Sequence, residues 1–141
     1  MTAIDTASLP AAPVALAEGD SFELTAGPLT RTNFVRYAGA SGDFHPLHHD
    51  EVFAQAAGMP SVFGMGMLHG GMLGVALARW VGPENIRSFA IRFTGQVWPG
   101  DTLTLTGRVE RIEDGSAQLA LAVTRQTGDD AIRATATATV A

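Results

Sequence analysis

The chain has 141 residues, of which 46% are hydrophobic, so it is long enough to build the core of one domain. It contains no cysteine, which excludes disulfide bonds, thiolate catalysis and cysteine ligands for a metal. Its formal net charge of −5 and its lack of a basic segment argue against nucleic acid as a partner.

Residues 1–17 are rich in Ala, Pro and Ser and show no hydrophobic period. This composition predicts a flexible leader over residues 1–17, followed by one domain over residues 18–141. Asp5 and the lack of cationic residues near the start do not match a secretory signal, and we therefore expect a cytoplasmic protein.

One short strand and two short helices are expected next. The alternation in Phe22–Leu24 favours a strand. Thr30 is a good N-cap for a helix that ends near Tyr37–Ala40, and Asp50 is a good N-cap for a second helix that reaches Ala56.

The segment Gly66–Val81 is apolar nearly all round, which predicts a buried helix. Its glycines would let the helix approach a sheet closely. A membrane-spanning segment over Ser61–Trp80 is the alternative, because Gly66, Gly70 and Gly74 repeat at a spacing that also occurs where membrane helices pack. The glycines themselves, His69 and Arg79 weaken that alternative, and we expect no membrane association.

Beyond residue 82 the hydrophobic period changes to two, which predicts four consecutive strands. Their alternating apolar residues are Phe89, Ile91 and Phe93; Leu103, Leu105 and Val109; Leu119, Leu121 and Val123; and Ile132, Ala134, Ala136 and Ala138. Between the first two of these runs, Trp98-Pro99-Gly100-Asp101 is typical of a hairpin turn with a structural role. The order of elements predicts an α+β domain in which an antiparallel sheet wraps one central helix.

The densest group of polar residues, Ser41–Asp50, falls in a predicted loop just before the buried helix. A turn at Pro46 can bring Asp43 and His48 to one water molecule, and such a pair suits general acid–base catalysis. In one alternative, Asp43 only caps a turn and the histidines are solvated. In another, a metal is bound by His45, His48, His49 and Asp50. Pro46 removes the regular structure that would aim adjacent residues at one ion, and we expect no metal.

The start of the buried helix, Phe63–Leu68, is a second candidate site. Backbone N–H groups there lack intrahelical partners, so the Gly66 N–H is suited to stabilise an oxyanion. The alternative is that these glycines only permit close packing. The chain has no G-x-S-x-G sequence and therefore no recognisable serine nucleophile. His69, inside the apolar helix, is expected to be a hydrogen-bonded core or interface residue.

The segment Tyr37-Ala38-Gly39-Ala40-Ser41-Gly42-Asp43-Phe44-His45-Pro46-Leu47-His48 resembles the hydratase motif of MaoC-like (R)-specific enoyl-CoA hydratases and of related dehydratase subunits of mycolic acid synthesis. That motif reads aromatic-Ala-x-x-Ser-Gly-Asp-x-Asn-Pro-hydrophobic-His. Weaker matches are Gly66-Met67-Leu68, Arg92-Phe93 and Pro99-Gly100-Asp101. The resemblance covers Phe22 to the C-terminus.

The resemblance implies a hot-dog fold, an antiparallel sheet around a long helix. It also implies that Asp43 and His48 activate water for reversible hydration of a trans-2-enoyl thioester, and that the Gly66 N–H polarises the thioester carbonyl. In the reverse direction, a (3R)-hydroxyacyl thioester loses water. The supporting residues would be Ser41, Gly42, His45 and Pro46. No cofactor is implied.

Two positions depart from the motif: His45 replaces its asparagine, and Met65 replaces the usual histidine before the helix glycine. The first puts the hydrogen bonding of the loop in doubt, although His45 can still donate. The expected partner is an acyl thioester of coenzyme A or acyl carrier protein. An exposed sheet edge predicts a homodimer or higher oligomer, with a heterodimer as the alternative. Two other functions stay open: thioester hydrolysis, and a non-catalytic subunit of a heteromeric dehydratase.

Overall fold

The structure, a computed structural model, describes residues 9–141; residues 1–8 of the predicted leader lie outside the described residues. Its helices and strands in chain order are β1 (Ser21–Ala26), α1 (Arg31–Ser41), the 3-10 helix η2 (Pro46–His48), α2 (Glu51–Ala56), α3 (Gly66–Val81), the 3-10 helix η3 (Pro83–Asn85), β2 (Ile86–Phe93), β3 (Leu103–Glu113), β4 (Ser116–Arg125) and β5 (Asp130–Thr139). The predicted α+β class is confirmed, and α3 has the predicted bounds.

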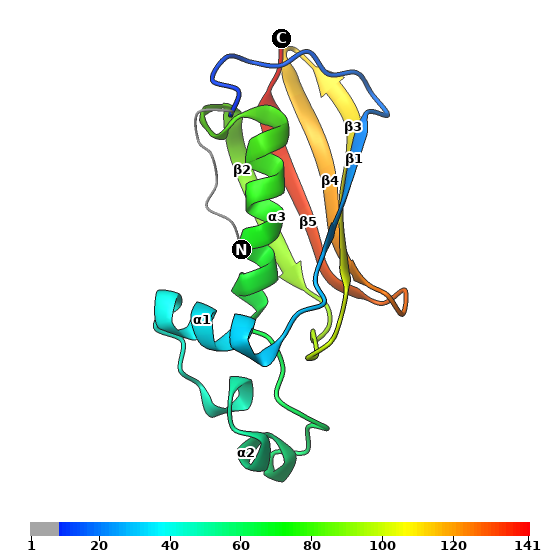
Figure 1. Ribbon diagram of the computed structural model, residues 1–141. Helices are drawn as coiled ribbons and strands as arrows, with labels where there is room; N and C mark the ends of the chain where they lie inside the picture. The colour runs from blue at the N-terminus through cyan, green and yellow to red at the C-terminus, as the bar shows by residue number, and fades with distance from the viewer. Residues whose placement is uncertain (1–8) are drawn as a thin grey trace.

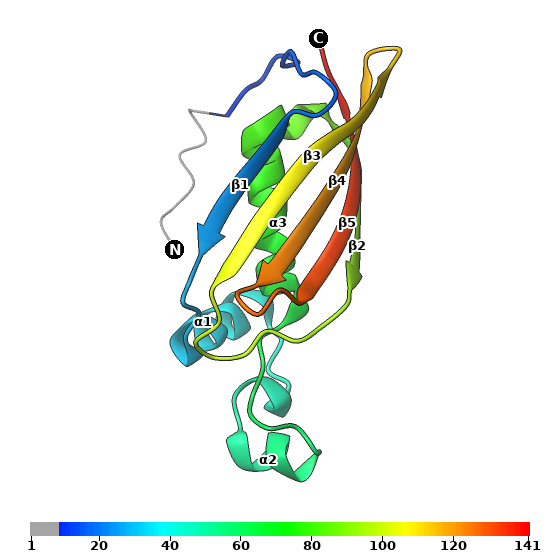
Figure 2. The same ribbon diagram turned by 90° about the vertical axis from the view of Figure 1, so that its right-hand side faces the viewer.

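The strands form one sheet in the order β1-β3-β4-β5-β2, and every neighbouring pair is antiparallel. The helix α3 lies along one face of this sheet (Figures 1 and 2). The sheet therefore wraps one central helix, as expected, with β1 and β2 as its two edges.

The predicted hairpin turn at Trp98–Asp101 is wrong. The segment does make a tight turn, since Asp101 N–H donates to the Trp98 carbonyl over 3.1 Å. However, β2 pairs with β5 and β3 pairs with β1, so the turn does not join two paired strands. Residues 94–102 instead cross the end of the sheet. A Pro-Gly-Asp turn fixes local geometry but carries no information on strand order.

The core lies between α3 and the sheet face that carries the predicted alternating residues. Leu73, Leu77 and Val81 on α3 are fully buried against this face. A Cβ atom at Gly70 or Gly74 would lie 3.3 Å from a side-chain carbon of β2, which explains why α3 carries glycine where it meets this edge strand. None of the helices in residues 9–141 combines the length and the hydrophobicity needed to cross a membrane.

The two short helices gather at the end of the sheet where α3 begins (Figure 1). Thr30 caps α1 as expected, accepting a hydrogen bond from Asn33 N–H over 3.2 Å. Glu51 ties the helices together, because its Oε2 atom accepts from Arg31 over 2.7 Å and from Ser61 over 3.2 Å. The hydrogen bond from Arg31 lowers the pKa of Glu51.

Residues 9–17 contain no helix or strand. One hydrogen bond joins this segment to the other end of the chain, from Ala141 N–H to the Val14 carbonyl over 2.9 Å. The flexibility of the leader stays a prediction.

Candidate active site

Asp43 and His48 lie side by side. Helix α1 ends at Ser41, and Gly42 turns the chain with a positive φ of 76°. The turn at Pro46 opens η2, whose last residue is His48. These two turns leave Asp43 Oδ2 3.7 Å from His48 Nε2. The Asp43 side chain is 45% exposed and that of His48 only 12%, so the carboxylate faces solvent while the imidazole is mostly enclosed.

The tautomer of His48 follows from its second ring nitrogen, which lies 2.7 Å from the Phe63 carbonyl oxygen. A carbonyl oxygen can only accept, so Nδ1 carries the proton. In the neutral ring, Nε2 then presents a lone pair to the Asp43 carboxylate. Two acceptors 3.7 Å apart do not hydrogen bond to each other, but both can accept from one water molecule.

Hydrogen bonds within the loop hold Asp43 in place. Asp43 N–H donates to Ser41 Oγ over 3.1 Å, and Asp43 Oδ1 accepts from His45 N–H over 3.3 Å. His45 Nδ1 in turn accepts from Leu47 N–H over 3.2 Å and caps η2. Where the family motif has asparagine, the imidazole of His45 thus supplies an acceptor at Nδ1, while its Nε2 carries the proton and can still donate.

A cavity of about 430 Å³ joins Asp43 to the start of α3. Its walls are formed by Tyr37, Ser41, Asp43, Phe63, Gly64, Met65, Gly66, Met67, His69, Phe93, Gly95 and Gln96. Gly66 is the first residue of α3, and within residues 9–141 its N–H finds no acceptor. A Cβ atom at Gly66 would lie 2.6 Å from Phe93 Cε1, so any larger residue there would require the Phe93 ring to move. The positive end of α3 therefore opens into the cavity beside Asp43.

His69 also lines this cavity, one helical turn beyond Gly66. It is 1% exposed, and neither ring nitrogen has a hydrogen-bond partner in the described part of the chain. The prediction of a buried histidine is confirmed, but the predicted hydrogen bond is wrong. Burial lowers the pKa of His69 to about 4, so the ring is neutral at pH 7.

The other polar residues of the loop face elsewhere. His49 Nε2 lies 3.1 Å from the Phe44 carbonyl, and Asp50 Oδ1 accepts from Phe53 N–H as the N-cap of α2. Over the described range, no three His, Asp or Glu side chains are grouped to hold a metal ion.

Two residues of the cavity wall, Phe63 and Gln96, are not identified as site residues by the sequence alone. The sequence places Phe63 only near the start of the buried helix. In the structure, its carbonyl oxygen fixes the tautomer of His48. Gln96 has no sequence signal, because it stands just before Trp98–Asp101, where the sequence predicts a hairpin turn.

The geometry can be compared with known proteins. A family model described as MaoC like domain matches residues 14–130. The chain belongs to this family. The 3-hydroxyacyl-thioester dehydratase Y from Mycobacterium tuberculosis is 40% identical over 95 residues, which cover 64% of this chain and 32% of that protein. The beta subunit of 3-oxo-4,17-pregnadiene-20-carboxyl-CoA hydratase from the same organism is 31% identical over 74% of this chain and 81% of its own length.

Solved structures agree with the family. The R-hydratase PhaJ1 from Pseudomonas aeruginosa superimposes with a TM-score of 0.78 and 27% identity, over 89% of this chain and 84% of its own. The (R)-hydratase from A. caviae gives a TM-score of 0.80 at 22% identity, over 89% of this chain and 98% of its own, a likeness of fold alone. The hot-dog fold of this MaoC-like chain is thereby confirmed.

Proposed function

We propose that the protein is a hydro-lyase that adds water to trans-2-enoyl thioesters and removes it from (3R)-hydroxyacyl thioesters. The observation that carries this proposal is the facing pair of acceptors, Asp43 Oδ2 and His48 Nε2, because Asp43 lines a cavity that also receives the N-terminus of α3. The Asp43–His48 pair can hold a water molecule by both of its hydrogens, and the N-terminus of α3 can stabilise a developing negative charge.

The reaction follows from this arrangement. Asp43 and His48 accept the two hydrogens of a water molecule, which leaves a lone pair of its oxygen directed at C3 of the enoyl group. As the C3–O bond forms, the electrons of the C2–C3 double bond move toward the thioester oxygen. The Gly66 N–H donates to that oxygen, a contribution of about 3 kcal/mol in oxyanion holes generally. The proton that leaves the water is accepted by the pair and returned to C2, which completes the addition of one water.

The substrate class rests on similarity. The chain spans 5% of the fatty acid synthase subunit beta of Aspergillus oryzae and 32% of 3-hydroxyacyl-thioester dehydratase Y. The names of these relatives support an acyl thioester substrate, and coenzyme A and acyl carrier protein are both suitable carriers. Aromatic and methionine side chains among the cavity residues suit an acyl chain.

The test is hydration of crotonyl-CoA, followed by loss of the enoyl absorbance. The wild-type protein is expected to consume the enoyl signal without releasing free thiol. Asp43→Asn should lower kcat/KM by about a thousandfold, because general acid–base groups contribute roughly two to four orders of magnitude. Glu113→Gln, at an exposed ion pair on β3, is the matched control and should leave the rate unchanged.

Release of free thiol without loss of the enoyl group would instead identify a thioester hydrolase. Full activity in Asp43→Asn would contradict the proposed water site. A wild-type protein that is inactive with enoyl thioesters on either carrier, whatever their chain length, would overturn the proposal and favour a non-catalytic subunit.

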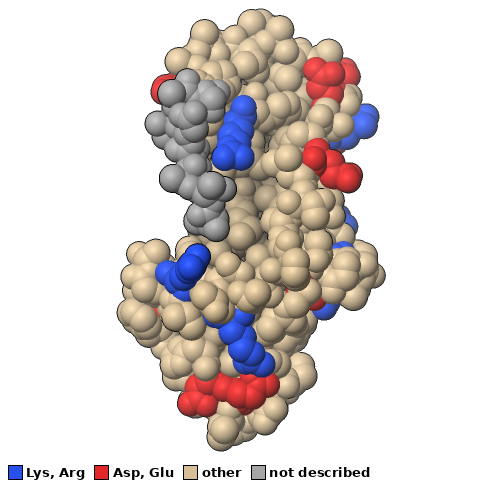
Figure 3. All heavy atoms as spheres, viewed as in Figure 1, with Lys and Arg blue, Asp and Glu red and all other residues tan. Residues whose placement is uncertain are grey.

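We also propose that the chain works as a dimer or higher oligomer. The edge strand β2 is paired on one side only, and Phe93 beside the cavity is 54% exposed. Few charged side chains occupy the face that contains α3 (Figure 3). A related fold with a TM-score of 0.78 and 27% identity occurs in the ChsH1–ChsH2 complex from Mycobacterium tuberculosis, so a heteromeric partner is the alternative. A monomeric mass by sedimentation at micromolar concentration would contradict self-association.

A further inference from the structure

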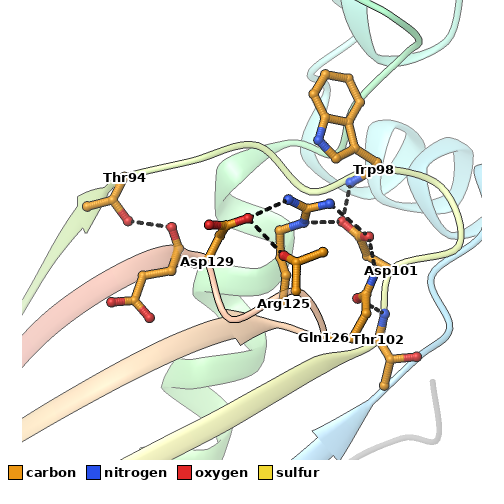
Figure 4. A network of polar contacts seen from close by, with 9 residues as sticks. Thr94, Trp98, Asp101, Thr102, Arg125, Gln126 and Asp129 are labelled. Atoms are coloured by element: carbon orange, nitrogen blue, oxygen red, sulfur yellow. Dashed lines mark hydrogen bonds and ion pairs between the residues drawn. The ribbon is translucent and has the colours of Figure 1, made fainter.

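A buried ion pair lies at the end of the sheet, outside the cavity (Figure 4). Arg125, at the end of β4, donates from Nε to Asp101 Oδ2 over 2.6 Å and from Nη2 to Asp101 Oδ1 over 3.2 Å. The side chains of Asp101 and Arg125 are only 5% and 17% exposed. Gln126 adds a hydrogen bond to Asp101 Oδ1 over 2.8 Å. This bidentate pairing of guanidinium and carboxylate fixes both side chains in orientation as well as distance.

The ion pair holds residues 94–102, which cross the end of the sheet and are called the crossing segment below. The sequence predicts a hairpin turn there. Asp101 Oδ2 also accepts from Trp98 N–H over 2.8 Å, and so fixes the backbone of Trp98 (Figure 4). The carbonyl of the preceding residue, Val97, accepts from Gly64 N–H over 2.8 Å. The crossing segment is thereby bonded to the chain just before α3.

Aromatic rings connect Trp98 to His48 by way of Phe63. The ring of Trp98 meets that of Phe63 edge to face, with centroids 5.9 Å apart, and Phe63 meets His48 in the same way at 5.1 Å. The Phe63 carbonyl oxygen accepts a hydrogen bond from His48 Nδ1. Phe63 N–H donates to Leu47 O over 3.2 Å, so Phe63 is held between the crossing segment and η2.

We propose that Trp98, anchored by the Asp101–Arg125 ion pair, is a positioning residue that holds the Phe63 carbonyl against Nδ1 of His48 and so keeps the Nε2 lone pair directed at the water site. The inference rests on the proposed function of His48. Trp98 does not line the cavity that contains Asp43, and its contact with His48 runs through the ring of Phe63.

The physical reason is the choice between two tautomers. A neutral imidazole carries its proton on either nitrogen, and the hydrogen bond to Phe63 O selects Nδ1. If the carbonyl moves away, the tautomer with the proton on Nε2 becomes populated. That tautomer donates toward Asp43 and no longer accepts from water. Loss of the anchor therefore lowers kcat while the binding of the thioester is retained.

The experiment compares Trp98→Leu with Trp98→Phe. Leucine removes the ring that meets Phe63, whereas phenylalanine keeps an aromatic edge there. Nitrogen-15 NMR of the histidines reports the tautomer directly, with His48→Gln used to assign its signal among the four histidines. In Trp98→Leu, we expect the Nε2-protonated form of His48 to appear and kcat for crotonyl-CoA to fall by about ten- to a hundredfold, since a misplacement of about 1 Å can lower the rate a hundredfold. KM should change less than kcat. Trp98→Phe should restore both readouts most of the way.

Val109→Ala is the matched control, because it removes a fully buried side chain from β3 without touching the contacts described above. It should lower stability and leave the His48 tautomer unchanged. An unchanged tautomer and kcat in folded Trp98→Leu would overturn the positioning role. The NMR readout needs no turnover, so it remains decisive if the wild-type protein proves inactive and the proposed hydration fails.

Discussion

Two of the carboxylate–base pairs in the molecule, Asp101–Arg125 and Asp43–His48, differ in how completely they are hydrogen bonded. At the crossing segment, Arg125 Nε lies 2.6 Å from Asp101 Oδ2, and both side chains are mostly buried. The guanidinium binds both oxygens of the Asp101 carboxylate. At the cavity, Asp43 and His48 stand 3.7 Å apart, and the carboxylate is 45% exposed. The first pair has little hydrogen-bonding capacity left, whereas the second keeps Asp43 Oδ2 and His48 Nε2 free to bind a third group.

This difference in hydrogen bonding fits two different roles, since the Asp101–Arg125 pair stabilises the backbone and the Asp43–His48 pair can bind a further group. Burial alone would raise the pKa of Asp101, but the hydrogen bonds from Arg125, Trp98 N–H and Gln126 outweigh it and the pKa is lowered. A carboxylate committed in this way stays charged and fixes the backbone. The Asp43 carboxylate receives one backbone hydrogen bond, from His45 N–H to Oδ1, whereas Oδ2 is the oxygen beside His48. The protein thus places its complete pair where rigidity is needed and its incomplete pair where water must bind.

Arg125→Met tests the contrast most strongly. It leaves the buried Asp101 carboxylate without its partner, and it should lower the free energy of unfolding by about 3 kcal/mol or more at pH 7. Asp43→Asn, at the exposed pair, should change it by less than about 1 kcal/mol. Urea denaturation of both variants provides the measurement. Arg111→Met, which removes an equally ionic but exposed pair with Glu113, is the control.

The pH dependence of the Arg125→Met effect has a definite sign. The folded-state pKa of Asp101 is lowered, so its stabilising contribution is present above the carboxyl pKa of the unfolded chain, about 4. It is lost as the pH falls below that value. The difference between wild type and Arg125→Met should therefore shrink in acid. Equal losses of stability in Arg125→Met and Asp43→Asn at pH 7 would remove the distinction between the two pairs.

His69 belongs to neither class, since it is buried and neither of its ring nitrogens is bonded within the described range. Its pKa falls from 6.5 to about 4 on burial, so the unfolded chain binds a proton that the folded chain excludes between these values. Stability should accordingly fall as the pH is lowered from 6.5 to 4, by about 3 kcal/mol in total from this group.

In His69→Leu this part of the pH dependence should disappear. Urea denaturation at several pH values between 4 and 7 measures it, and His49→Gln, at an exposed loop histidine, is the control. Parallel curves for wild type and His69→Leu would mean that His69 is protonated or bonded in the folded protein.

Much of the fold could be predicted because the hydrophobic patterns are strong. The apolar run of α3 and the period-two runs of β3, β4 and β5 each have one compatible structure. The crossing of residues 94–102 could not be predicted, since β2 would show the same alternation beside β3 or beside β5. Strand order depends on long-range packing, which a local turn sequence does not encode.

The candidate site was predicted in part. The resemblance of residues 37–48 to a known motif placed Asp43 near His48, and the structure brings the two together. The Phe63 carbonyl was outside the reach of such reasoning, because a backbone oxygen has no residue signature. The role of His45 was open for a similar reason, since an imidazole nitrogen can either donate or accept.

The smallest expected effect concerns the turn that presents Asp43. Gly42 ends α1 with a φ of 76°, and a Cβ atom there would meet nothing within 4 Å. Gly42→Ala therefore introduces backbone strain without a clash and should lower the free energy of unfolding by about 1 kcal/mol. Gly39→Ala is a matched control of opposite sign: Gly39 lies inside α1, also with open space around it, and alanine is favoured there by up to about 1 kcal/mol. Thermal denaturation of the two variants should shift in opposite directions. A shift in the same direction would contradict this expectation, because it would mean that the left-handed conformation at Gly42 does not strain an alanine.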